Sequence, residues 1–443
     1  MRDPATHAAF RFGLGPAPGE AGYIGQDPRG WLLEQLAQPP RTPAALRKLD
    51  SADKRTDELL RVRDQGTGAI EAFIKQKAAK DYLTDLGLYL SATISAEQPF
   101  LDRLAIFWAN HFTVSVDRPA VFGLVVPFYV EAIRPNLLGR FSDLLIASTR
   151  HQAMLLYLDQ AVSFGPNSKA GFVKGFGLNE NLAREILELH TLGVEGGYTQ
   201  TDVRQLALIL TGWTLQRPQD PEPGAFQFVE AGHEPGDKEL LGRQFREAGL
   251  AEGMAALEFL ATRAATARFV ATKLARHFIA DEPPLSAIEH LAAVFSQTGG
   301  DLPALYRALI ELDAAWQDPL GKLRTPQEIV IATLRALQAT DRKALTGAID
   351  SLKVLGQLPF YASSPAGYSD RAKDWAGPDQ VLKRVDWAAT AGDRIARMVA
   401  PLDFLATALG GFADSELLFQ VDNAPSRAEA MALVLASPTF QRR

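Results

Sequence analysis

The chain has 443 residues, of which 47% are hydrophobic and 22% charged, and its formal net charge is −6. A chain of this composition can bury a sizeable core, and its negative charge argues against a surface built to bind nucleic acid or anionic lipid. It contains no cysteine, which excludes disulfides and thiolate nucleophiles, so any metal site would have to use His, Asp or Glu side chains.

The N-terminal segment predicts helices rather than a targeting signal. Residues 1–11 carry charge and a proline but no apolar run, so no signal peptide is visible and a cytoplasmic location is expected. Asp3 precedes Pro4, and Asp27 precedes Pro28. Each pair places a capping acceptor ahead of a first-turn proline and therefore predicts the start of a helix.

A helical pattern continues as far as residue 111. Residues 57–93 are compatible with a helix that is weakened at Gly66 and Gly68, and another helix is expected to begin at Pro99. In that helix the large and mostly apolar residues recur at helical spacing: Phe100, Leu104, Phe107, Trp108 and His111. This periodicity predicts that one face of the helix is buried.

The rest of the chain is also predicted to be mostly helical. Helices are expected at residues 142–158, 179–191 and 199–211, and again between residues 251 and 355. Residues 214–245 break this pattern with Pro- and Asp-rich turns and alternating phenylalanines, which predicts a short β-hairpin insertion. Residues 357–377 are loop-like, and two last helices follow.

The expected fold is therefore mostly α, a single large multi-helical domain over residues 1–443 with a short β-hairpin insertion at 214–245. No eighteen apolar residues occur in a row, so no membrane span is predicted. No period of 20 to 50 residues repeats, which disfavours a solenoid.

The strongest concentration of polar residues lies on the predicted helix at 179–191, within a candidate site region at residues 159–213. One face of this helix carries Asn181, Arg184, Glu185 and Glu188 at helical spacing, and the other face is apolar. A solvated stripe would also explain such a face. However, the preceding loop is rich in Gly, Asn and Ser, which is typical of a binding loop leading into a helix N-terminus.

The site hypothesis gives each of these side chains a role. Glu185 is predicted to act as general base or ligand, Arg184 to orient an anionic group, and Asn179 and Asn181 to supply hydrogen bonds, while Glu188 completes the ligand-binding set.

Other side chains are predicted to lie around this helix. His111 and His277 each precede a phenylalanine among apolar neighbours. We expect both to border the site, with His111 in a catalytic role, although such a histidine is more often a hydrogen-bonded core residue. Trp213 is expected to border the pocket, and Asp159 could pair with Glu185 as acid and base.

Metal binding is a weaker possibility. His233 sits on a predicted turn, where a solvated residue is the commoner case. If His111, His233 or His277 met Glu185 or Glu188 in space, a His and carboxylate metal site would be chemically reasonable. No HExxH spacing is present, so the metal and any other cofactor stay unknown, and no nucleotide-binding or serine-hydrolase motif appears.

Several motifs together resemble the bacterial domain of unknown function 1800 family. The main one is Asn-Glu-Asn-Leu-Ala-Arg-Glu at residues 179–185, followed by Leu192-Gly193, Gly197-Tyr198-Thr199 and Thr211-Gly212-Trp213. Supporting matches span nearly the whole chain: Arg11-Phe12-Gly13, 107–112, 165–168, Lys238 with Leu241-Gly242, Lys322 with Thr325-Pro326, and Gly356-Gln357 with Trp375. The resemblance implies a mostly helical body, export to the periplasm in many relatives, and a neighbouring gene for a sulfatase-like protein.

The sequence is therefore compatible with two functions. The first is an enzyme, hydrolase-like, or a small-ligand binder with a polar pocket on the 179–191 helix. The second is a non-catalytic helical scaffold that partners a sulfatase-like exported protein, in which the same polar residues fix helix packing. A concave pocket lined by these side chains would favour the first function, and a closed network facing a flat apolar patch the second.

Overall fold

The computed structural model, which describes residues 3–174 and 177–443, is mostly helical, as predicted. The helices of the N-terminal part are α1 (Pro4–Arg11), α2 (Glu20–Ile24), α3 (Pro28–Leu36), α4 (Ala52–Arg63), α5 (Thr67–Phe73), α6 (Ala79–Ile94), α7 (Pro99–His111) and α8 (Val125–Phe128). The next group comprises α9 (Phe141–Arg150), α10 (Gln152–Tyr157), α11 (Lys169–Lys174), α12 (Asn181–Glu185) and α13 (Gln200–Ile209). Short π-helices follow α5, α8 and α12, at Ile74–Ala78, Tyr129–Ile133 and Ile186–Thr191.

The second half of the chain begins with strands and ends with helices. The strands are β1 (Trp213–Leu215), β2 (Phe226–Phe228), β3 (Lys238–Leu240) and β4 (Arg243–Phe245). The helices are α14 (Leu250–Ala261), α15 (Ala264–Phe278), α16 (Leu285–Gln297), α17 (Leu302–Glu311), α18 (Pro326–Leu337), α19 (Arg342–Leu355), α20 (Pro378–Ile395), α21 (Pro401–Leu409), α22 (Ser415–Asp422), α23 (Arg427–Ala436) and α24 (Pro438–Gln441).

The predicted hairpin insertion is confirmed, and it consists of two hairpins. β1 pairs antiparallel with β2 and places Trp213 opposite Phe228. β3 pairs antiparallel with β4 across a two-residue turn at Leu241 and Gly242, both of which have positive φ angles. That backbone conformation is the one that two-residue hairpins prefer.

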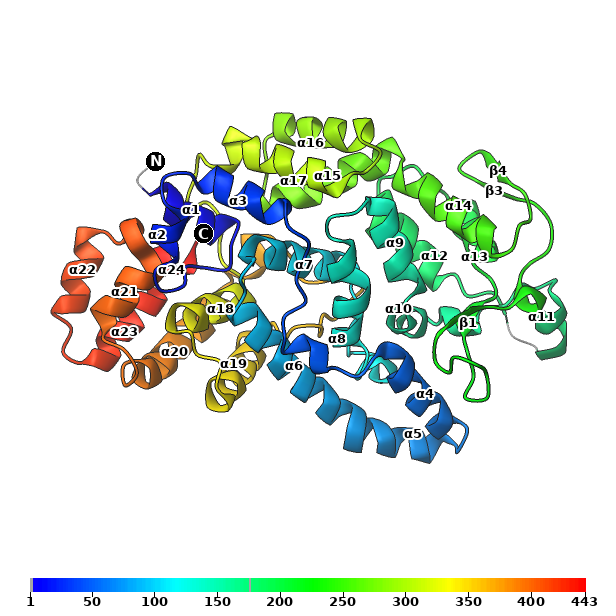
Figure 1. Cartoon of the computed structure of the whole chain (residues 1–443), viewed down its shortest axis with the longest axis horizontal. Helices are drawn as coiled ribbons and strands as arrows, with labels where there is room; N and C mark the ends of the chain where they lie inside the picture. The colour runs from blue at the N-terminus through cyan, green and yellow to red at the C-terminus, as the bar shows by residue number, and fades with distance from the viewer. Residues whose placement is uncertain (1–2, 175–176) are drawn as a thin grey trace.

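Helix α7 lies in the middle of the molecule (Figure 1). The α15–α17 group forms one edge, α4–α6 the opposite edge, and α20–α23 gather at one end. The predicted buried face of α7 is confirmed, because Phe100, Leu104 and Trp108 are fully buried. They belong to a continuous cluster of buried apolar side chains that extends from Ala5 to Phe440. The core thus holds α7 rigidly, and residues on its remaining face can be positioned accurately.

Candidate functional site

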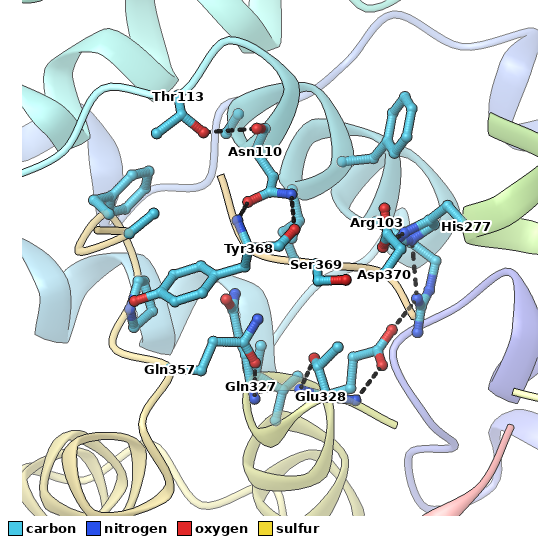
Figure 2. Close-up of a pocket in the computed structure, with 18 of the residues that line it drawn as sticks. Arg103, Asn110, Thr113, His277, Gln327, Glu328, Gln357, Tyr368, Ser369 and Asp370 are labelled. Carbon is cyan, nitrogen blue, oxygen red and sulfur yellow. Dashed lines mark hydrogen bonds and ion pairs between the residues drawn. The ribbon is translucent and has the colours of Figure 1, made fainter. Parts of the chain in front are cut away.

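A pocket lies against α7, on the side of the helix that carries Arg103, Phe107 and Asn110 (Figure 2). Its cavity volume is about 80 Å³. Its walls come from α7, the C-terminal end of α15, the N-terminal end of α18 and the loop at residues 357–370. The pocket therefore joins segments that are far apart in the sequence. Its polar lining comprises Tyr89, Arg103, Asn110, Thr113, His277, Thr325, Gln327, Glu328, Gln357, Tyr368, Ser369 and Asp370, and all of these except Tyr89 and Thr325 are labelled in Figure 2.

One wall of the pocket carries a histidine–aspartate pair. Nδ1 of His277 lies 2.7 Å from Oδ1 of Asp370, and Nε2 lies 3.3 Å from Nη1 of Arg103. Because a guanidinium can only donate, Nε2 is the acceptor and Nδ1 carries the hydrogen that is donated to Asp370. The bond to Arg103 is long for a nitrogen donor, so the lone pair on Nε2 is only weakly engaged.

The protonation states of this pair follow from its surroundings. Burial lowers the pKa of His277 below its ordinary value, against the opposing effect of Asp370. Burial alone would raise the pKa of Asp370, but His277, Lys322 and Lys273 together hold it below its ordinary value. At neutral pH the pair is therefore a neutral imidazole held by an ionised carboxylate, which is the state that a general base requires.

The adjoining wall is a buried ion-pair network. Arg103 Nη1 lies 2.5 Å from Oε1 of Glu328, and Arg443 Nε lies 2.8 Å from the same oxygen. The other oxygen of Glu328 accepts a 2.8 Å hydrogen bond from the backbone of Thr325, which forms a capping box at the start of α18. Arg103 also donates to the carbonyl of Gly13. Glu328 thus ties α7, α18 and the C-terminal segment together.

The loop at residues 357–370 is fastened to α7 by one amide side chain. Asn110 donates from Nδ2 to the carbonyl of Tyr368 at 2.8 Å and accepts from the backbone N–H of Tyr368 at 2.7 Å. Other bonds also hold the loop, among them Val116 N to the carbonyl of Phe360 at 2.9 Å and Ser115 Oγ to that of Ala362 at 2.6 Å. An irregular segment thereby gains a fixed place, which positions Asp370.

Gly367 is required where this loop crosses α7. Its φ is +77°, and a Cβ atom there would lie 2.5 Å from the carbonyl oxygen of Asn110 and 2.7 Å from Oγ1 of Thr113. We expect Gly367→Ala to cost about 2–4 kcal/mol of unfolding free energy, from positive-φ strain plus displacement of the loop. Gly356 is the matched control, because its φ is +81° but its Cβ would meet nothing within 4 Å. Urea unfolding measures the change. If Gly367→Ala and Gly356→Ala lost equal amounts of unfolding free energy, the close crossing of the loop over α7 would not be what requires glycine at position 367.

The opposite wall supplies amide groups. Gln357 Oε1 accepts a 2.8 Å bond from the backbone of Gln327, and Gln327 Nε2 donates to the hydroxyl of Tyr89 at 2.8 Å. Within residues 3–174 and 177–443, Nε2 of Gln357 makes no hydrogen bond. Gln357 is buried and lines the pocket, so this N–H group can donate to a bound molecule.

A model of a known family matches residues 7–442 of the chain. The match is to the protein of unknown function family DUF1800, and it covers nearly the whole chain. The chain belongs to the DUF1800 family. No curated protein and no solved structure matches it. The resemblance noted from the motifs is thus confirmed.

Of the site residues predicted for this DUF1800 chain, only His277 lines the α7 pocket. His111, on the same helix, is 1% exposed and donates from Nε2 to the carbonyl of His190 at 3.0 Å. Burial, followed by Lys273 and His190, lowers the pKa of His111 well below its ordinary value. His111 is therefore held as a neutral core residue among aromatic rings, which is the commoner role considered for it.

The polar face of the predicted helix lies elsewhere. Arg184 is 40% exposed in its side chain and contacts Glu180 at 3.4 Å and Gln200 at 3.0 Å. Glu185 is half-buried and has no hydrogen-bond or ion-pair partner in the described part of the chain. Burial, followed by Glu188, raises its pKa above the ordinary value. Glu188 accepts a 3.3 Å bond from the hydroxyl of Tyr198.

The remaining predicted residues have local partners. Asn179 Oδ1 accepts from the backbone of Asn181 at 2.9 Å, a turn that leads into α12, and Asn181 itself is exposed. Asp159 forms a two-pronged pair with Arg118 at 2.7 and 3.0 Å. Trp213 is fully buried against Phe226. The predicted residues thus do not form one site: His277 lines the α7 pocket, His111 and Trp213 are buried in the core, and Arg184, Glu185 and Glu188 lie on or just after α12.

Within the described residues no group of three or more His, Asp or Glu side chains is placed to hold a metal ion, so the metal hypothesis for this DUF1800 chain gains no support. The helices of the same residues include none that is long and apolar enough to cross a membrane.

Several pocket residues were not singled out from the sequence: Arg103, Asn110, Glu328, Gln357 and Asp370. Three of the supporting family motifs, 107–112, Thr325-Pro326 and Gly356-Gln357, contribute residues to the pocket lining, and Gly13 of a fourth accepts the bond from Arg103. Residues of motifs that are shared with the family therefore surround the α7 pocket. They were the available signal for the α7 pocket.

Proposed function

We propose that the α7 pocket binds a small polar molecule and that His277, oriented by Asp370, acts on it as a general base in a hydrolase-like reaction. The observation that carries this proposal is the 2.7 Å contact between Nδ1 of His277 and Oδ1 of Asp370 at the wall of a cavity. A carboxylate on Nδ1 fixes the tautomer that leaves Nε2 as the acceptor.

The chemistry would be activation of a water molecule. Water gives a proton to Nε2 of His277 while its oxygen bonds to an acyl carbon of the substrate. The bond from that carbon to the leaving group then breaks, and the leaving group departs with the electron pair and takes up the proton from Nε2. Gln357 supplies a free N–H group for a substrate oxygen. Arg103 and Glu328 hold the wall rather than react, because their charged atoms already pair with each other.

Hydrolysis of p-nitrophenyl acetate tests where the activity resides, since its acetyl group suits a cavity of about 80 Å³. Ala109 lines the pocket, so Ala109→Leu should fill it and lower the rate by at least about tenfold. Ala109→Ser, which keeps the size, should retain the rate. An unchanged rate in Ala109→Leu, or no rate above the uncatalysed reaction in the wild type, would contradict the proposal.

The site predicted around Glu185 is the second location to test. It is supported by the half-buried, unpaired carboxyl of Glu185, whose pKa is raised by burial and by Glu188, because perturbed carboxyl groups gather at functional sites. In the same assay Glu185→Gln should leave the rate unchanged if His277 is the base. Loss of the rate in Glu185→Gln, with no loss in Ala109→Leu, would move the site to α12.

The scaffold function, with a sulfatase-like protein as the partner, is a separate proposal. It is supported by exposed apolar side chains on α20, namely Val381, Leu382 and Val385, which are 45–64% exposed, since such patches mark protein contacts. Co-purification of a sulfatase-like protein with the wild-type chain, and its loss when these three residues are changed to Ser, would support a scaffold. Failure to co-purify would leave the enzyme proposal alone.

A further inference from the structure

Helices α18, α19 and α20 lie next to one another (Figure 1). A second cavity, separate from the α7 pocket, is lined by residues of these three helices. We call it the α18–α20 groove. Its volume is about 380 Å³, within the range of small-molecule pockets. Its lining is mainly apolar and includes Leu334, Leu337, Ala348, Trp387 and Ile395.

Small residues on α19 keep the groove open. Ala344, Gly347, Ala348 and Ser351 recur at the i, i+3, i+4 and i+7 spacing of one helix face, and all four line the groove. Larger side chains at these positions would fill the space between α19 and α20. The apolar volume is thus a direct consequence of side-chain size on this face.

The mouth of the groove carries an excess of positive charge. A shallower hollow adjoins the groove and shares Lys343, Gly347 and Arg394 with it. Arg342 also lines the hollow. In residues 3–174 and 177–443, Arg342, Lys343 and Arg394 form no ion pair.

The acidic groups at the mouth are already engaged. Asp341 caps α19 through the backbone N–H groups of Lys343 and Ala344, and Asp350 lies 3.7 Å from Lys353. A further arginine, Arg397, is paired with Asp393 at 2.6 Å. Two unpaired cations, Lys343 and Arg394, therefore line the mouth of an apolar groove, and a third, Arg342, lies in the adjoining hollow, in a protein whose net charge is −6. This arrangement is complementary to an anionic head joined to an apolar chain.

We propose that the α18–α20 groove binds a single-chain fatty acid, with the acyl chain between α19 and α20 and the carboxylate at Lys343 and Arg394. The proposal does not depend on the reaction proposed for the α7 pocket, which shares no lining residue with this groove.

Calorimetric titration of the purified chain with defined amphiphiles tests both halves of the ligand. Affinity should rise by about fourfold per methylene from hexanoate to decanoate, since each buried methylene contributes a nearly constant amount. Decanol and decylamine should bind more weakly than decanoate. Equal or tighter binding of decylamine would overturn the anionic head, and tighter binding of decyl phosphate than of decanoate would overturn its assignment as a carboxylate.

A variant whose side chain fills the groove tests where the fatty acid binds. A Cβ at Gly347 would meet only Nη1 of Arg394 at 3.4 Å, and Gly347 has no positive φ. Gly347→Leu should therefore fold, with a helix at least as stable as the wild type, yet weaken decanoate binding at least tenfold. Gly87, a helical glycine of α6 whose Cβ would meet nothing within 4 Å, gives the control Gly87→Leu. Equal affinities in the two variants would overturn the location.

The charges give an independent test. The double variant Lys343→Gln, Arg394→Gln should weaken decanoate by about fivefold, the size expected for exposed ion pairs, and leave decanol binding unchanged. Lys75→Gln, an exposed lysine on the π-helix after α5, is the matched control. If the double variant also bound decanol more weakly, or if Lys75→Gln weakened decanoate binding equally, Lys343 and Arg394 would not be the groups that bind the carboxylate.

Discussion

Replacing Glu328 by Ala should lower the free energy of unfolding by about 3–5 kcal/mol, the cost of breaking a buried ion pair from one side. Glu328 is 13% exposed in its side chain and faces Arg103 and Arg443, which are 4% and 1% exposed. Without the carboxylate both guanidinium groups would stay buried with their nearest counter-charge removed. The capping box with Thr325 would be lost as well. Urea unfolding at neutral pH measures the change.

Glu328→Gln and an exposed pair provide the controls. The Arg29–Asp313 pair has side chains that are 42% and 82% exposed, so Asp313→Ala should cost no more than about 1 kcal/mol. Burial alone would raise the pKa of Glu328, but Arg443 and Arg103 hold it well below the ordinary value. Its stabilising effect is therefore complete above about pH 4.5 and is lost as the pH falls towards the folded-state pKa. The difference between wild type and Glu328→Gln should shrink over that range, and a constant difference would contradict the ion-pair argument.

The helices were predictable because their signals are local. Asp27 before Pro28 predicted the start of a helix; α3 begins at Pro28, and Asp27 accepts a 2.9 Å bond from the backbone of Gly30. The spacing of apolar residues after Pro99 gave the buried face of α7 correctly. Both signals act over one or two turns of chain, so nothing distant had to be known.

The α7 pocket depends on contacts that no local pattern contains. Asp370 meets His277 across 93 residues, and Glu328 meets Arg103 across 225. The residues next to each of them in the sequence form no motif that would mark a site. Only the packing of α15 and α18 against α7, together with the crossing of the loop at Gly367, brings them to one cavity. His277 could be suggested from its own surroundings, whereas the carboxylate that orients it could not.

His233 shows the same limit at shorter range. The sequence predicted a turn, and His233 does follow a short 3-10 helix at Glu230–Gly232. The solvated environment expected there is wrong, because His233 is buried and its Nε2 lies 3.0 Å from Glu252 and 3.2 Å from Lys238. A polar segment signals a turn but does not reveal whether partners elsewhere in the chain cover it.

Removing the carboxylate of Asp370 should lower the rate of p-nitrophenyl acetate hydrolysis by about 10²–10⁴-fold in Asp370→Asn, similar to the loss in His277→Gln. An amide at position 370 can present its NH₂ group to Nδ1 of His277, which would shift the imidazole hydrogen to Nε2 and remove the acceptor. Asp374→Asn is the matched control, because Asp374 is exposed on the short 3-10 helix that follows the loop, and the 2.5 Å bond that it accepts from Ser369 can also be accepted by an asparagine oxygen. Its rate should be close to that of the wild type.

The pH profile separates an orienting carboxylate from a merely structural one. Burial lowers the pKa of His277 below 6.5, and Asp370 opposes this shift, so the wild-type rate should rise as the pH passes through a value below 6.5 and then level off. In Asp370→Asn the opposing effect is gone, and the midpoint of the residual rate should move to lower pH. Since loosened packing around an unperturbed histidine would reduce the rate without this displacement, an unmoved midpoint would mean that Asp370 supports the loop and does not act through His277.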